Sequence, residues 1–165
     1  MNIFLCGSNQ LTALDRDEIK KFLTDYAYKH KIYILCYKSI ENEVLRFFVE
    51  NERLAQNLCL YTLQPLHLLT DEFQEVVDYL KAHGARYTAF DHPYDSIYRS
   101  EYMFFVKQIV EDTNLVLCFY NGDKHTSIIP VDVAKDAGID AGIYDLPGLH
   151  EKQMKKSFEQ KIRMM

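Results

Sequence analysis

The sequence lacks several features that would assign it to a well-defined class of protein. It has no run of eighteen apolar residues, so we expect no membrane-spanning helix, and its first ten residues lack the basic stretch that opens a signal peptide. None of its four cysteines belongs to a Cys-x-x-Cys pair and each lies in an apolar run, so we expect reduced, buried thiols, no metal site and a cytoplasmic location. No nucleophile elbow, P-loop, Gly-x-Gly-x-x-Gly loop or His-Glu-x-x-His helix occurs. Positive evidence for catalysis is therefore thin, and no cofactor is implied.

The sequence also has fewer basic than acidic residues. The 165 residues carry 19 Lys and Arg against 24 Asp and Glu, a net charge of −5, which argues against a general nucleic-acid binder. A small phosphorylated ligand stays compatible with this balance, because one helix N-terminus and one arginine can hold a phosphate in an acidic protein.

Short apolar segments alternate with segments of helical periodicity along almost the whole chain. We expect strands at residues 2–6, 31–36, 58–63, 86–90, 115–120 and 142–146. The alternation predicts an α/β fold: a three-layer Rossmann-like domain with a mainly parallel sheet and helices on both faces. This domain should span residues 1–148. A helical tail should follow at 149–165, and its apolar stripe would either pair copies into a homo-oligomer or fold back on its own core.

Helix starts are marked by short polar residues. Asp15 followed by Glu18 suggests a capping box at the first helix, while Ser39 and Thr70 are expected to cap the second and third.

Three loops should meet at the carboxyl-terminal edge of the sheet, where α/β proteins bind ligands. They are residues 7–9, 37–39 and 121–127. The last follows a strongly apolar strand within the stretch 114–138 and contains a turn and a hydroxyl pair. The ligand-binding candidates are Gly7, Ser8, Ser39, Arg99, Gly122, Thr126 and Ser127. The structural alternative is that the glycines only make turns and Ser39 only caps its helix.

Arg99 stands at the start of a predicted helix, where a cation opposes the helix dipole. Its planar fork could hold a phosphate or carboxylate bidentately, or it could form a salt bridge to Asp95 or Glu101. The catalytic residues are unknown. Glu41 and Asp132 are weak candidates for a working carboxylate.

This layout resembles the SLOG superfamily, the Rossmann-like group that includes the DNA-processing protein A fold and lysine-decarboxylase-like phosphoribohydrolases. Gly7-Ser8 matches its first loop, Arg99-Ser100-Glu101-Tyr102-Met103 keeps the arginine and methionine of its Arg-Asn-x-x-Met helix start, and Asn121-Gly122 with Thr126-Ser127 resembles its Gly-Thr loop. Where the family has a Gly-Gly-rich loop after its second strand, this chain has Cys36-Tyr37-Lys38-Ser39-Ile40-Glu41. The Pro-Gly-Gly-x-Gly-Thr-x-x-Glu signature of the phosphoribohydrolases is also absent. The resemblance implies a nucleotide-derived ligand, while these departures count against nucleotide-monophosphate cleavage.

Three hypotheses follow. The first is a domain that binds a small phosphorylated or nucleoside-type ligand. The second is an enzyme acting on an N-glycosidic bond, similar to a nucleoside deoxyribosyltransferase or a phosphoribohydrolase, in which Glu41 or Asp132 would supply the carboxylate. Asp132 would then replace the glutamate that the deoxyribosyltransferases carry near this position. The third is a structural or partner-binding module with a decayed pocket.

Overall fold

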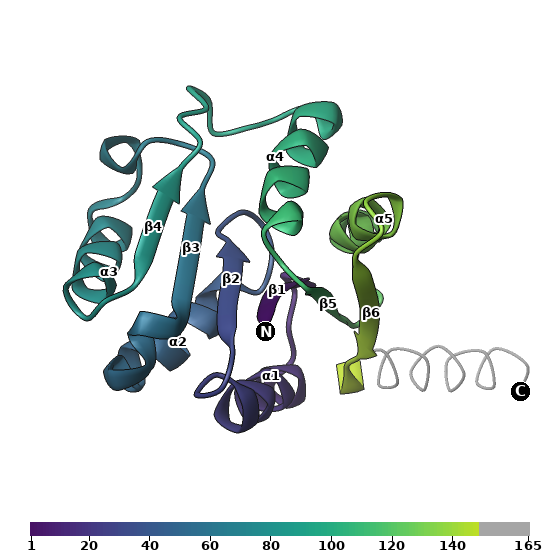
Figure 1. Ribbon diagram of the computed structural model, residues 1–165, viewed down its shortest axis with the longest axis horizontal. Helices are drawn as coiled ribbons and strands as arrows, with labels where there is room; N and C mark the ends of the chain where they lie inside the picture. The colour runs from purple at the N-terminus through teal and green to yellow at the C-terminus, as the bar shows by residue number, and fades with distance from the viewer. Residues whose placement is uncertain (149–165) are drawn as a thin grey trace, which may run out of the picture.

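A six-stranded, fully parallel sheet forms the centre of the computed structural model, which describes residues 1–148 (Figure 1). The strands are β1 (Asn2–Gly7), β2 (Lys31–Leu35), β3 (Leu58–Thr62), β4 (Arg86–Ala89), β5 (Leu115–Tyr120) and β6 (Asp140–Asp145), in the order β4-β3-β2-β1-β5-β6. The helices are α1 (Ala13–Tyr26), α2 (Glu41–Glu50), α3 (Asp71–Ala82), α4 (Arg99–Glu111) and α5 (Ile129–Asp136). Short 3₁₀ segments lie at η1 (Glu52–Asn57), η2 (Leu66–Leu68) and η3 (His125–Ile128). Each expected strand is present to within two residues at either end.

Helices cover both faces of the sheet, as the sequence pattern predicts. Because successive side chains of a strand point to opposite faces, β1 sends Ile3 and Leu5 into one core and Phe4 and Cys6 into the other. The first core also holds side chains of α1, α2 and α3, and the second holds those of α4 and α5. The near-continuous apolar strands thus supply two cores, and the three-layer α/β expectation is confirmed.

The strand order reverses beside β1. From β1 the chain builds outward through β2, β3 and β4, and then returns to place β5 on the other side of β1. At this point β1 and β5 are packed very closely: a Cβ added to Gly7, whose φ is +151°, would lie 2.1 Å from the carbonyl oxygen of Phe119. Only glycine fits this backbone, so the switch point of the sheet depends on Gly7.

The helix starts differ in part from the sequence expectation. Thr12, not Asp15, caps α1: its hydroxyl accepts a hydrogen bond from the Asp15 N–H (3.2 Å), and the Asp15 carboxylate accepts one from the Thr12 N–H (3.0 Å). Asp15 is therefore the N3 partner of the capping box, in the first turn of α1, a role that the sequence had assigned to Glu18. The Thr70 cap of α3 is confirmed, whereas the Ser39 cap of α2 is wrong because no side-chain cap bond is present there.

Asp15 also joins segments that are far apart in sequence. Its buried carboxylate accepts hydrogen bonds from the side-chain amide of Asn121 (2.8 Å) and from the N–H of Gly148 (2.7 Å). The start of α1, the end of β5 and the segment after β6 are thereby held at one edge of the sheet. The predicted tail at 149–165 lies outside the described residues. No helix within residues 1–148 is long and apolar enough to cross a membrane.

Candidate functional site

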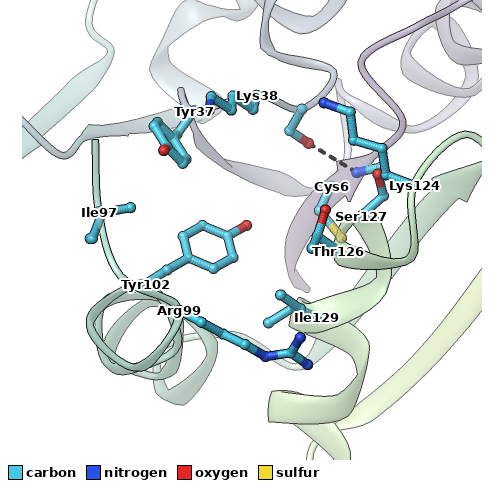
Figure 2. A pocket seen from close by; sticks show the side chains of 12 residues that line it. Cys6, Tyr37, Lys38, Ile97, Arg99, Tyr102, Lys124, Thr126, Ser127 and Ile129 are labelled. Atoms are coloured by element: carbon cyan, nitrogen blue, oxygen red, sulfur yellow. Dashed lines mark hydrogen bonds between the residues drawn. The ribbon is translucent and has the colours of Figure 1, made fainter. Parts of the chain in front are cut away.

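A pocket of about 230 Å³ opens at the carboxyl ends of the strands, beside the point where strand order reverses (Figure 2). We call it the switch-point pocket, because α/β sheets bind their ligands at such positions. Its lining comes from four segments that are distant in sequence. They supply Cys6 and Gly7 from β1; Tyr37, Lys38 and Ser39 from the loop after β2; Ile97, Arg99 and Tyr102 at the start of α4; and Lys124, Thr126, Ser127 and Ile129 from the connection between β5 and α5.

Three cations surround the pocket: Lys38, Arg99 and Lys124. All three are exposed, and among residues 1–148 no carboxylate lines the pocket. Across residues 1–148, none of the three forms an ion pair. In a chain with more acidic than basic residues, this edge of the sheet is therefore a local positive region suited to an anion.

Arg99 is the first residue of α4 and has no ion-pair partner among the described residues. The salt bridge considered from the sequence is not formed. Glu101 instead approaches His92, with 3.8 Å between Oε2 and Nδ1, and Asp95 is an exposed loop residue. Arg99 gains nothing from the helix dipole at this position, since cations are favoured at the opposite end of a helix. Figure 2 shows its guanidinium at the edge of the pocket beside Ile129.

Two tyrosines form one wall of the pocket. The rings of Tyr37 and Tyr102 lie 5.9 Å apart between centroids, and Figure 2 shows the Tyr102 hydroxyl pointing into the space between Tyr37 and Thr126. Burial, assisted by Cys6 and Glu41 nearby, raises the pKa of Tyr102. This phenol therefore keeps its proton at neutral pH and can donate a hydrogen bond to a ligand oxygen.

The loop after β2 is held in place by its own hydrogen bonds. The Ser39 hydroxyl accepts a hydrogen bond from the Gly7 N–H (2.9 Å, dashed in Figure 2), which ties this loop to the end of β1. The Glu41 carboxylate accepts one from the Ser39 N–H (2.8 Å). Burial raises the pKa of Glu41, in opposition to backbone hydrogen bonds from its own N–H and those of Ser39 and Lys38. Glu41 thus supports the loop from behind and does not line the pocket.

Asp123 holds the loop after β5 in the same way. Its carboxylate accepts hydrogen bonds from the backbone N–H groups of Asn9 (3.1 Å) and Gln10 (3.3 Å), in the loop after β1. It also accepts bonds from the Lys124 N–H (2.6 Å) and the Ser127 hydroxyl (3.2 Å). The two loops that flank the switch point are therefore joined through one carboxylate.

Ser8 lies beneath these loops and is fully buried. Its hydroxyl accepts a hydrogen bond from the Asn121 N–H (3.0 Å). Partial burial raises the pKa of Asp123, but the hydrogen bonds from Ser8 and from the neighbours named above outweigh it, so the pKa is lowered. Ser8 is thus part of the support under the pocket.

The structure gathers most of the residues proposed from the sequence as ligand-binding. Those that line the pocket are Gly7, Ser39, Arg99, Thr126 and Ser127. Ser8 and Gly122 do not line it: Ser8 is buried, and Gly122 is an exposed turn residue with a φ of +79°. Whether the lining residues bind a ligand stays a prediction.

The two carboxylates considered for catalysis are placed elsewhere. Glu41 is behind the loop after β2, and Asp132 is exposed on the first turn of α5. Neither lines the pocket. In the part of the chain that the structure describes, no three His, Cys, Asp or Glu side chains converge so as to hold a metal ion.

Sequence reasoning missed the two lysines and the two tyrosines of the pocket. Tyr37 and Lys38 precede Ser39 in a loop that had been singled out, and Lys124 lies within the loop 121–127. Tyr102 follows Arg99 by three residues on α4, a spacing that places both side chains on one helix face. Each could have been found by listing the sequence neighbours of the predicted ligand-binding residues that lie at the same edge of the sheet or on the same face of a helix.

Comparison with solved structures decides the fold. The chain superposes on DNA processing protein A (DprA) from Streptococcus pneumoniae with a TM-score of 0.60 and 12% sequence identity, over 86% of this chain and 49% of that one. The chain has a DprA-like fold. This confirms the Rossmann-like architecture, and the chain spans about half the length of DprA. No family model and no curated protein sequence matches the chain.

Proposed function

We propose that this protein binds a phosphorylated, nucleotide-type ligand in the switch-point pocket and does not cleave it. The observation that carries the proposal is the charge of the pocket. Lys38, Arg99 and Lys124 surround it, no carboxylate lines it, and within residues 1–148 these cations have no ion-pair partner. A phosphoryl group would supply the missing negative charge, and the fork of Arg99 suits it geometrically.

Neutral groups of the pocket support a ligand that also has an apolar, ring-containing part. Tyr37, Ile97, Tyr102 and Ile129 give the lining an apolar wall, while the Thr126 and Tyr102 hydroxyls can hydrogen-bond to sugar or phosphate oxygens. The volume of about 230 Å³ is small compared with the roughly 300–1,000 Å³ of pockets that hold drug-sized ligands. A mononucleotide therefore suits it better than a dinucleotide.

Binding without cleavage is favoured over the N-glycosidic enzyme by the position of the carboxylates. An acid or base must come within hydrogen-bond reach of the bond that it breaks. Glu41 is engaged with the backbone of its own loop, and Asp132 is exposed on α5 and does not line the pocket. The four free cysteines fit a reducing compartment, and we place the protein in the cytoplasm on this ground.

Thermal denaturation with a ligand panel tests the proposal. The panel contains inorganic phosphate, ribose 5-phosphate, the four common nucleoside 5′-monophosphates, adenosine and a short single-stranded DNA. A ligand at one hundred times its dissociation constant stabilises the folded state by about 2.7 kcal/mol. In a chain of this size that raises the melting temperature by roughly 5–10 °C.

We expect at least one monophosphate to produce this shift and adenosine to produce much less. Arg99→Ala should remove the shift, while Arg53→Ala should retain it, because Arg53 is an exposed residue of η1 at the opposite edge of the sheet. No shift with any nucleotide at millimolar concentration contradicts the proposal. A shift in melting temperature with DNA alone would indicate that the pocket binds a nucleic acid and not a small ligand. Release of free base from a nucleotide would favour the enzyme hypothesis.

A further inference from the structure

Lys38 holds a backbone conformation that is unfavourable for a lysine. Its φ is +47°, in the left-handed region that only glycine adopts without steric cost. Such outliers persist where the surrounding structure enforces them, and they concentrate at binding sites. Here the neighbouring Ser39 enforces it through the bonds from Gly7 to its hydroxyl and from its own N–H to Glu41. The loop thus presents a cation at a position whose geometry favours glycine.

The position of Lys38 in the fold indicates which part of a nucleotide it would contact. In Rossmann-like sheets, an acidic residue that follows the second strand binds the ribose hydroxyls of a nucleotide, and a cation in its place accommodates a phosphate on the ribose. Lys38 follows β2 and lines the switch-point pocket. The acidic residue of this loop, Glu41, has its carboxylate on the Ser39 N–H and does not line the pocket. Among the described residues, no carboxylate is therefore available to bind ribose hydroxyls at the end of β2.

Arg99, another of the three cations, lies on the other side of the pocket. Figure 2 shows Arg99 and Lys38 on opposite sides of Tyr102, with the Lys38 side chain beside Tyr37. The Lys38 Nζ lies 5.3 Å from the centroid of the Tyr37 ring. Because the Tyr102 ring lies between the two cations, we expect them to contact different parts of a bound molecule. A ligand with a single phosphoryl group would leave one of them unused.

We infer that the switch-point pocket selects a nucleotide with two separate phosphoryl groups, one on the 5′ carbon held by Arg99 and one on the 2′ or 3′ carbon of the ribose held by Lys38. This inference rests on the proposed function and adds the class of ligand. Nucleoside 2′,5′- and 3′,5′-bisphosphates belong to this class. Nucleoside 5′-monophosphates and 5′-diphosphates do not, since their phosphoryl groups all lie at one end.

Calorimetry on the full chain with four adenosine nucleotides tests the inference. They are the 5′-monophosphate, the 5′-diphosphate, the 2′,5′-bisphosphate and the 3′,5′-bisphosphate. A hydrogen-bonded charge pair corresponds to about a tenfold gain in affinity or more. We therefore expect at least one bisphosphate to bind about tenfold more tightly than the monophosphate, and more tightly than the 5′-diphosphate, which carries comparable charge in a different place.

Variants separate a specific role of Lys38 from general electrostatics. Lys38→Ala should remove the bisphosphate preference, and Arg99→Ala should weaken binding of all four nucleotides. Lys31→Ala is the matched control, because Lys31 is an exposed lysine at the other end of β2; it should leave the preference intact.

Equal affinity for mono- and bisphosphates would overturn the inference and leave the proposed function standing. A 5′-diphosphate that binds as tightly as the bisphosphates would overturn it as well, since charge alone would then explain the gain. Equal losses in the Lys38 and Lys31 variants would also refute it. If none of the four nucleotides binds, both the inference and the proposed function fail for adenosine ligands.

Discussion

Replacing Asp123 with asparagine should loosen the switch-point pocket without removing any of its cations. One oxygen of the carboxylate accepts the N–H groups of Asn9 and Gln10, and the other accepts the Lys124 N–H and the Ser127 hydroxyl. An asparagine side chain has only one oxygen. One of the two pairs of donors must therefore face an amide NH₂ group, which cannot accept their hydrogen bonds.

The expected cost follows from the number of bonds lost. A hydrogen bond to a charged group contributes roughly 1.5–3 kcal/mol, and the value falls when solvent reaches the pair, as it does for this partly exposed carboxylate. With about 1 kcal/mol for each of two bonds, Asp123→Asn should lower the free energy of unfolding by about 2 kcal/mol. Asp95→Asn is the matched control, since Asp95 is exposed in a loop, and its effect should stay within about 0.5 kcal/mol.

The pH dependence of this difference tests the cause. Partial burial raises the pKa of Asp123, but the stronger effect of its hydrogen bonds lowers it in the folded state. The stability that the carboxylate contributes is therefore complete above the unfolded pKa of about 4 and is lost as the pH falls through the lower folded value.

Urea denaturation at pH 7, 5 and 3.5 measures the difference between wild type and variant. We expect the same difference in the free energy of unfolding at pH 7 and 5 and a smaller difference at pH 3.5. A difference that does not change with pH, or a urea midpoint of the variant equal to that of wild type at pH 7, would refute the assignment of Asp123 as the support of this loop.

Three further substitutions probe the surrounding backbone. Gly7→Ala should cost more than about 3 kcal/mol, or prevent folding, because the new Cβ would lie 2.1 Å from the Phe119 carbonyl oxygen; near-normal melting would show that β1 and β5 can separate. Glu41→Gln should leave the protein as stable or more stable at pH 7, since burial raises the pKa of Glu41. Wild type should lose stability as the pH rises through that folded pKa, and the variant should not. A less stable variant with an unchanged pH profile would contradict this. Lys38→Gly should raise the free energy of unfolding by roughly 0.5–1 kcal/mol, because glycine avoids the cost of about 1–2 kcal/mol of the φ of +47° and the larger entropy of its unfolded state offsets part of this gain; a destabilised variant in urea denaturation would show that the conformation is not strained.

The sheet could be predicted from the sequence because its buried strands are continuous runs of apolar residues. The run Leu115–Tyr120 and its counterparts in β1, β2 and β3 are apolar on both faces, and this occurs where helices cover both sides of a parallel sheet. Helix starts were harder to locate. Asp15 and Ser39 are both good capping residues, yet each is engaged in hydrogen bonds with segments far away in sequence. Local preference cannot reveal such distant partners.

The site was predictable at the level of its loops but not of its side chains. The carboxyl ends of parallel strands share an edge, so the loops that contain Gly7, Ser39 and Thr126 had to meet. Which side chain of a loop faces the pocket depends on backbone angles that the sequence does not show. Ser8 faces the interior, whereas Lys38, with its positive φ, faces the pocket.

The most direct test of the central claim compares one nucleoside with its own 5′-monophosphate. Calorimetric dissociation constants would be measured for wild type, Arg99→Ala and Arg53→Ala, with the base that gives the largest thermal shift. The account predicts that the phosphate improves wild-type affinity by about tenfold or more, that Arg53→Ala keeps this gain, and that Arg99→Ala loses it. A nucleoside that binds as tightly as its monophosphate, or a phosphate gain that survives in Arg99→Ala, would contradict the claim that this pocket holds an anion.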